Sequence, residues 1–401
     1  MYKNIKNGMQ SFLKISSLFI AASLLHSCKK ETRGVDFSAD LINTDNLIKE
    51  VINEIHNNYA DNIVRERLEI GAINGMLTVL DEHSIYINKD EFNIYNQSAR
   101  GSFWGIGIEI KQVKDGIEIS SVIDETPAAK GGIKPLDVIT HINGKDVSDV
   151  TLKALVSNLN SDFASKINLS ILRNKSERLE ISLKKSPIQI KSVKLSFIDD
   201  IAIIKISHFN ENTLLSVSQA IRKVNKKKSL GVVIDLRNNP GGILEQAIGI
   251  SDLFLVNKKI TELKSKNIQE SRSVFSDDFD LLNGIPMAIL INSNTASGAE
   301  LMASALGENK RAVLIGEKTH GKGSLQTMIP IPGRGAIKLT TAYFISPLGN
   351  MINQKGVAPD IEIEKNQTND SATLQNADSV ILRAMDLLHG IFALNETENK
   401  K

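Results

Sequence analysis

The sequence has little cysteine and tryptophan and almost no net charge. A single cysteine among 401 residues excludes an internal disulfide. The 48 Lys and Arg residues against 46 Asp and Glu leave a formal charge of +2, which is too small to indicate a nucleic-acid partner. No low-complexity block or repeat of fixed period argues for a solenoid or a propeller. The length allows two or three domains, each with its own core.

The apolar run at residues 15–25 is shorter than the roughly 20 residues that a transmembrane helix needs. It follows several lysines and has the length of a signal-peptide core. The only cysteine, Cys28, comes directly after it in Leu-His-Ser-Cys, which resembles the bacterial lipobox, with His26 as a departure. We therefore expect a lipoprotein-type signal peptide at 1–27 and a lipid on Cys28. The exported chain would be anchored in a membrane of the bacterial cell envelope and face the periplasm; an incidental thiol is the alternative.

Residues 28–97 are predicted to form a helical region. Apolar residues recur at steps of three and four along two stretches, 41–55 and 63–77, and each stretch predicts a helix with one apolar face. Turn-forming polar residues end the region near 80–86, where His83 is interpreted as a loop histidine. Helix packing alone would explain this module.

From residue 98 to residue 186 the pattern changes to short strands, predicted at 117–122, 137–142, 167–172 and 179–183, with a helix at 152–159. A glycine-rich turn before them exposes backbone N–H groups that suit a carboxylate. This stretch resembles a bacterial PDZ domain, although Leu136 stands where that family usually has glycine. The resemblance implies a loop that holds a peptide's terminal carboxylate, formed by Gly105, Ile106, Gly107 and Ile108. A small sheet with a tight turn is the alternative.

Residues 187–365 alternate apolar, β-branched runs with helical patterns, which predicts an α/β core. Strands are expected at 201–206, 230–236, 287–291, 312–315 and 336–342. After them, residues 366–401 form a C-terminal helical tail, in which a polar spacer precedes an amphipathic stretch.

Two segments of the core carry candidate chemistry. Ser297 lies between a predicted strand and a predicted helix, where its hydroxyl would face the free amides at the helix N-terminus. Taken alone, a serine at this position is better explained by helix capping. Lys322 lies between two glycines, which allow the backbone to turn tightly and direct the amine inward. Burial would lower the pKa of this lysine and allow the neutral amine to act as a general base.

Two other chemistries fit less well. The segment 316–323 nearly matches a phosphate-binding loop, but Gly323 occupies the position that needs Ser or Thr. A Ser-His-Asp triad would need His141, His208 or His320, none of which can be paired with an aspartate from sequence alone.

Together the two segments resemble the carboxyl-terminal processing, or tail-specific, serine peptidase family. The resemblance rests on Thr-Ala-Ser-Gly-Ala-Glu at 295–300, Gly-Lys-Gly at 321–323 and Asp-Leu-Arg-Asn-Asn-Pro-Gly-Gly at 235–242. The spacing from Ser297 to Lys322 is 25 residues (322 minus 297). The family implies an α/β core of the crotonase or ClpP-like kind, with an inserted PDZ domain and helical segments at both ends.

The resemblance also implies the role of each residue. Ser297 would be the nucleophile, Lys322 the base and Gln326 the residue that orients the lysine. Gly241 or Gly242 would form the oxyanion hole with Gly298. The implied partners are proteins or peptides with accessible C-terminal tails, and the terminal helices could support a homodimer. No metal or organic cofactor is required.

Two further functions remain open on the sequence. The chain could be an inert PDZ scaffold, or an enzyme that acts on thioesters with a crotonase-like core. The intact Ser297, Lys322 and Gln326 favour a peptidase over a scaffold, and a peptide-binding domain is of no evident use to a thioester enzyme.

Overall fold

The computed structural model describes residues 37–113, 116–147, 150, 165–174, 176–363 and 378–398. The predicted signal peptide 1–27, Cys28, the predicted helix 152–159 and most of the spacer after residue 365 lie outside these residues. The chain divides into two compact units, Met1–Glu69 and Ile70–Lys401. Among the described helices, none combines the length and the apolar character needed to cross a membrane.

The first unit contains α1 (Phe37–Asn58) and the beginning of α2 (Arg65–Thr78). The guanidinium of Arg65 donates a hydrogen bond to the Asn53 side chain at 3.0 Å. The sequence predicted a buried apolar stripe on α1, but Leu47 is 58 % exposed and Val51 is 47 % exposed. Much of that stripe therefore faces solvent.

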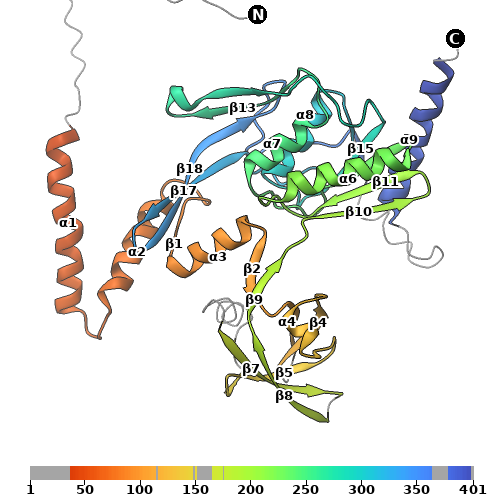
Figure 1. Ribbon diagram of the computed structural model, residues 1–401. Coiled ribbons are helices and arrows are strands. Elements are labelled where there is room, and N and C mark those ends of the chain that lie inside the picture. Colours follow the sequence, from red (N-terminus) through yellow and green to blue (C-terminus); the bar gives the residue numbers. More distant parts are fainter. Residues whose placement is uncertain are drawn as a thin grey trace, which may run out of the picture. The chain divides into compact units, whose positions relative to one another are not determined.

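A six-stranded sheet forms the centre of the second unit (Figure 1). Its order is β10 (Val193–Ile198), β11 (Ile201–Ile206), β12 (Gly231–Asp235), β15 (Met287–Ile291), β16 (Val313–Gly316) and β19 (Ile361–Glu362). The strands from β11 to β19 are parallel, and β10 pairs antiparallel at the edge. Strands of a parallel sheet are covered on both faces, which explains why they appear in the sequence as continuous apolar runs.

Successive side chains of these strands enter two separate cores. One face packs against α6 (Thr213–Lys227), α7 (Leu244–Asp252) and α8 (Gly298–Glu308). The other face packs against α9 (Ser379–Glu398), whose fully buried Ala384 and Leu388 lie among Ile201, Val233 and Leu290. The apolar stripe predicted in the C-terminal tail is therefore used within the chain.

A second sheet supports the segment that carries Lys322. Its order is β1 (Ile85–Ile87), β18 (Gly335–Ile345), β13 (Lys259–Ser265) and β14 (Arg272–Phe275), and β17 (Ser324–Ile331) also pairs with β18. Because β17 starts two residues after Lys322, its pairing with β18 fixes the chain on that side. The helix α3 (Lys89–Ala99) follows β1.

The PDZ-like stretch forms its own sheet and core. Its strand order is β3 (Ile108–Val113), β4 (Gly116–Val122), β5 (Val138–Ile142), β7 (Lys166–Arg173) and β8 (Glu177–Lys184). The short β6 (Lys145–Asp146) pairs with β5, and α4 (Pro127–Lys130) follows β4. Separately, β2 (Ser102–Gly105) and β9 (Ser186–Gln189) pair where the chain enters and leaves this stretch. Leu136 has a φ of 71°, a conformation that suits the glycine usual in the family.

Candidate active site

Ser297 occupies the sharp turn between β15 and α8. Its φ of 55° lies in the left-handed region, where side chains other than glycine are strained. A strained turn from strand to helix exposes the serine hydroxyl above the sheet, next to the free amides of the helix. The hydroxyl lies in a cavity of ≈ 520 Å³. The sequence-based placement of Ser297 is therefore confirmed, and its backbone departs from that of an ordinary helix cap, whose φ and ψ lie in the extended region.

One buried carboxylate, that of Glu300, joins the serine segment to the lysine segment. Its Oε2 accepts hydrogen bonds from the backbone amides of Ser297 and Lys322, both at 2.8 Å. Its Oε1 accepts from the Thr319 hydroxyl at 2.5 Å and from the Gly321 amide at 2.7 Å. Four donors satisfy a carboxylate that has no exposed surface. No role was predicted for Glu300 from the sequence, although a glutamate three residues after a cap-position serine is a known helix signal.

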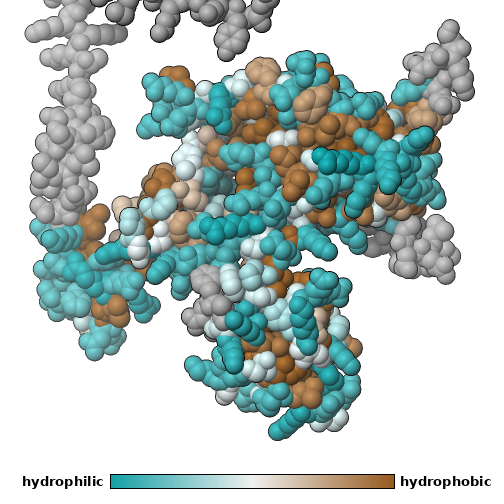
Figure 2. Space-filling model, in the orientation of Figure 1, coloured by the Kyte–Doolittle hydropathy of each residue, from teal (hydrophilic) through white to brown (hydrophobic). Residues whose placement is uncertain are grey.

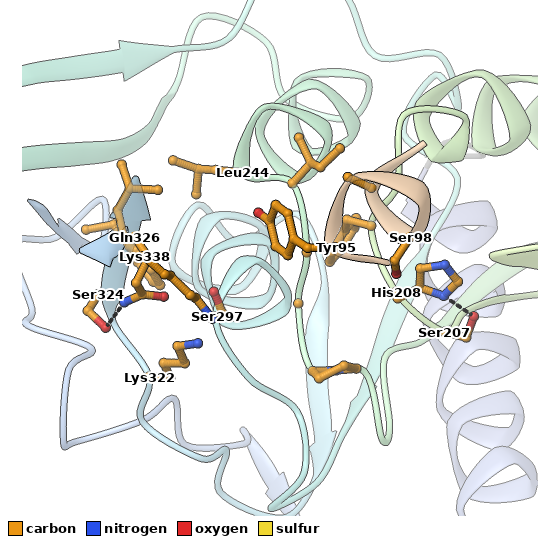
Figure 3. A pocket seen from close by; sticks show the side chains of 18 of the residues that line it. Tyr95, Ser98, Ser207, His208, Leu244, Ser297, Lys322, Ser324, Gln326 and Lys338 are labelled. Carbon is orange, nitrogen blue, oxygen red and sulfur yellow. Dashed lines mark hydrogen bonds between the residues drawn. The ribbon is translucent and has the colours of Figure 1, made fainter. Parts of the chain in front are cut away.

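Lys322 enters the same cavity from the turn after β16. The flanking glycines are required by the backbone: Gly321 has a φ of 92°, and a Cβ on Gly323 would lie 2.2 Å from the Asn353 amide nitrogen. Figure 3 shows Ser297, Lys322 and Lys338 directed toward one region of the pocket. The cluster thus combines a hydroxyl with two amines.

Burial lowers the pKa of Lys322 below the ordinary lysine value, and the positive charge of Lys338 lowers it further. The carboxylates of Glu300 and Glu82 act in the opposite direction but are outweighed. A larger fraction of Lys322 is therefore neutral at a given pH than for a lysine in water, which is the state that a general base needs. Lys338, on β18, was not identified from the sequence.

Gln326 lines the cavity, but its side-chain amide forms hydrogen bonds with residues other than Lys322. Its amide nitrogen donates to the Ser324 hydroxyl at 2.8 Å and to the Thr340 hydroxyl at 3.3 Å. Figure 3 shows the bond to Ser324, with the rest of the amide turned toward the part of the pocket that holds Lys322. Among the described residues Gln326 and Lys322 share no hydrogen bond, so the orienting role expected of Gln326 stays a prediction.

Of the glycines predicted for an oxyanion hole, Gly241 lies beside Ser297, and both Gly241 and Gly242 line the same cavity. A Cβ on Gly241 would lie 2.7 Å from the Ser297 Cβ and 3.0 Å from the Gly298 amide nitrogen. However, the Gly241 amide donates to the Asn239 side chain at 2.8 Å, whereas the Gly242 amide takes part in no hydrogen bond given for the described residues. Of the two glycines that the sequence left open, Gly242 is therefore the better partner for Gly298.

The rest of the cavity wall is largely apolar and includes Leu244, Leu325 and Phe344, together with Tyr95 from α3. His208 also lines the cavity, but its ring bonds to Ser207 and Asn210, and Figure 3 shows it on the side away from Lys322. Burial lowers the pKa of His208. This arrangement gives no support to a histidine base, and no group of three or more His, Cys, Asp or Glu that could hold a metal occurs in the described part of the chain.

The four residues predicted to hold a peptide carboxylate connect β2 to β3, the first strand of the PDZ-like sheet. Gly107 has a φ of 84°, and a Cβ there would lie 2.4 Å from the Thr126 side chain. The side chain of Ile106 is buried in the core of this sheet, and its carbonyl accepts from the Ala128 amide at 2.8 Å. Ile106 can therefore contribute only its backbone amide to a ligand. Gly105 is the last residue of β2, and Ile108 begins β3.

Comparisons with known proteins match both the α/β core and the PDZ-like stretch of the second unit. Residues 200–363 match the model of peptidase family S41, and residues 105–184 match the model of the PDZ domain. Taken with the fold, these matches define a serine-type peptidase that carries a PDZ domain.

Curated relatives make the assignment more specific. The chain is 37 % identical over 305 residues to a carboxy-terminal-processing protease of Bartonella bacilliformis, covering 75 % of this chain and 70 % of that protein. It is 33 % identical over 320 residues to the carboxy-terminal processing protease CtpA of Bacillus subtilis, covering 79 % and 68 %. A solved photosystem II D1 C-terminal processing protease aligns at 23 % identity with a TM-score of 0.48, over 79 % of this chain and 92 % of that one. The chain belongs to peptidase family S41, among the carboxy-terminal processing proteases.

Proposed function

We propose that this peptidase cleaves protein substrates near their C-terminal tails with Ser297 as the nucleophile and Lys322 as the general base. The observation that carries the proposal is the Glu300 carboxylate, which binds the amides of both residues and holds their two segments together. An inert scaffold would not need a strained serine and a partly buried lysine with a lowered pKa in the same cavity.

The steps follow from these positions. The neutral Nζ of Lys322 takes the proton of the Ser297 hydroxyl as its oxygen attacks the scissile carbonyl carbon. The amides of Gly242 and Gly298 stabilise the negative oxygen of the tetrahedral intermediate. Lys322 then donates its proton to the leaving amine, and a water molecule deprotonated by the same lysine releases the acyl group from Ser297.

Recognition of the tail is assigned to the PDZ domain. The strand β3 lies at the end of its sheet order, so in the described part of the domain its second edge has no partner strand. A peptide can add a strand at such an edge while backbone amides near Gly107 hold its terminal carboxylate. The predicted helix 152–159, which would form the other wall of this groove, lies outside the described residues.

The direct test is degradation of an unfolded reporter that ends in an apolar tail. The parent chain is expected to degrade it several times faster than a reporter with a polar tail or an amidated C-terminus, because both changes remove PDZ contacts. Ser297→Ala should degrade neither. Equal rates for all three reporters would contradict tail recognition, and degradation by Ser297→Ala would contradict the nucleophile.

The two amines in the cavity predict a shift in pH dependence. A base must be neutral, so kcat/KM should rise with pH as Lys322 loses its proton. Lys338→Met removes a positive charge that lowers the pKa of Lys322, and the rise should therefore move to higher pH. Lys338→Arg should retain the parental profile, as should Lys264→Met on the exposed side of β13. A profile that does not move in Lys338→Met would contradict the electrostatic role of this lysine.

Two proposals concern the setting of the enzyme. A lipid on Cys28 would anchor the chain in the bacterial envelope facing the periplasm, and an unmodified Cys28 in the mass of the mature protein would contradict it. A homodimer would use α1, where Leu47 and Val51 are exposed and Figure 2 shows spots of hydrophobic surface. The apolar stripe of α9 is already buried in its own sheet. A monomeric mass at micromolar concentration would contradict the dimer.

A further inference from the structure

A chain of hydrogen bonds leads from the catalytic cavity to Asp81, in the turn between α2 and β1. Gln326 lies directly opposite Thr340 in the pairing of β17 with β18. The Gln326 amide nitrogen donates to the Thr340 hydroxyl at 3.3 Å, and that hydroxyl donates to Asp81 Oδ1, also at 3.3 Å. Asp81 and Thr340 are 259 positions apart in the sequence.

Asp81 is held firmly in this place. Its Oδ1 accepts from the backbone amides of His83 and Ser84, both at 2.8 Å, and its Oδ2 accepts from the Ser84 hydroxyl at 3.0 Å. The buried Ser84 hydroxyl also accepts from the Thr340 amide at 3.2 Å. The turn is thereby joined to β18 at the residue that contacts Gln326.

The charge of Asp81 decides the direction of every bond in the chain. Burial raises the pKa of Asp81, but the hydrogen bonds from His83, Ser84 and Thr340 together outweigh it and lower the pKa below the usual aspartate value. An ionised carboxylate can only accept, so the single hydroxyl proton of Thr340 must point to Asp81. The Thr340 oxygen is then left to accept from Gln326 and cannot donate to it.

This direction fixes which end of the Gln326 amide faces the cavity. Because the amide nitrogen is required at Thr340, where it also reaches the Ser324 hydroxyl, the amide oxygen is turned toward the part of the pocket that holds Lys322 (Figure 3). An amide in the reversed orientation would place its oxygen against a hydroxyl oxygen that has no proton to offer. We propose that Asp81 and Thr340 are positioning residues of the peptidase, which hold the Gln326 amide so that its oxygen receives a hydrogen bond from the amine of Lys322.

The proposal rests on the proposed roles of Ser297, Lys322 and Gln326. It adds an explanation of how the Gln326 amide is held in one orientation. Thr340→Val keeps the side-chain shape but removes the hydroxyl, so the amide is no longer forced into one orientation. We expect kcat to fall about tenfold while KM changes less than about twofold, because one oriented hydrogen bond is lost and the peptide-binding wall is unchanged. Thr340→Ser retains the hydroxyl and should recover most of the loss.

The matched control lies one residue along the same strand. Thr341 pairs its hydroxyl with that of Thr327 at 2.6 Å, away from Gln326, so Thr341→Val should keep parental kcat and KM. Thermal unfolding of all variants in parallel separates a loss of folding from a loss of positioning.

A double-mutant cycle gives the decisive outcome. If Thr340 acts only through Gln326, then adding Thr340→Val to Gln326→Ala should cause no further loss. Asp81→Ala should behave in the same way in the Gln326→Ala background. A further tenfold loss in that background, or a loss in Thr341→Val as large as in Thr340→Val, would overturn the proposal. Activity retained by Ser297→Ala would instead overturn the catalytic assignment, so the two failures are distinct.

Discussion

Replacing Lys322 by alanine is expected to lower kcat for a peptide reporter by at least about 10³-fold, with little change in KM. The Ser297 hydroxyl would then lose its proton acceptor, while the Gly242 and Gly298 amides and the apolar wall stay in place. Ser297→Ala should cause a comparable loss. Because the two residues act in one step, the double variant should be no worse than either single variant. Initial rates at saturating and limiting reporter measure both constants.

Lys318→Ala is the matched control for this prediction. Lys318 is an exposed lysine four positions before Lys322 and outside the cavity lining, so its loss should leave the rates within about twofold of the parent. If Lys322→Ala kept more than about a tenth of the parental kcat, a base other than Lys322 would have to be found.

Glu300→Gln is expected to have the second-largest effect, because it leaves backbone amides without an acceptor. The carboxylate accepts two bonds on each oxygen, and an amide nitrogen in place of one oxygen would face N–H donors. Each buried donor left unsatisfied costs about 1–3 kcal/mol. We expect kcat to fall at least about 10²-fold, since the serine and lysine segments are no longer held together, together with a lower midpoint of thermal unfolding.

The same substitution at Glu308 provides the comparison. Glu308 lies at the end of the same helix and accepts from the Leu348 amide at 2.8 Å and from the Asn350 side chain at 3.0 Å, outside the catalytic cavity. Glu308→Gln should alter stability slightly and kcat hardly at all. Equal losses of kcat in the two variants would show that Glu300 is an ordinary structural carboxylate.

Features encoded by local patterns could be predicted from the sequence. The apolar runs at 201–206, 230–236, 287–291 and 312–315 became strands of the central parallel sheet, whereas the run at 336–342 became part of β18 in the second sheet. The strand patterns of the PDZ-like stretch also became strands. Ser297 was placed at a strand-to-helix turn and Lys322 between glycines that the backbone requires. In each case the local geometry depends on residues that are close together in the sequence, so these neighbours alone were enough to predict the strand or the turn.

Features that depend on contacts between distant segments were missed. The approach of Lys338 to Lys322 and the pairing of Thr340 with Asp81 arise from strand pairing in the second sheet, which no local spacing encodes. The choice between Gly241 and Gly242 depended on the Asn239 side chain, which occupies one of the two amides. Likewise, periodicity predicted apolar stripes on both terminal helices but could not tell that α9 covers its own sheet while much of the α1 stripe is exposed.

The most direct test of the Ser297–Lys322 assignment is the pH dependence of Ser297 phosphonylation by a fluorophosphonate, followed by intact mass and located by peptide mapping. Ser297 attacks phosphorus and fluoride leaves, so the reaction reports the activated hydroxyl without any need for tail recognition. We expect one adduct, on Ser297, whose rate of formation rises with pH below the range of an ordinary lysine and falls at least about 10²-fold in Lys322→Ala. An adduct on another residue, or an equal rate in Lys322→Ala, would contradict it.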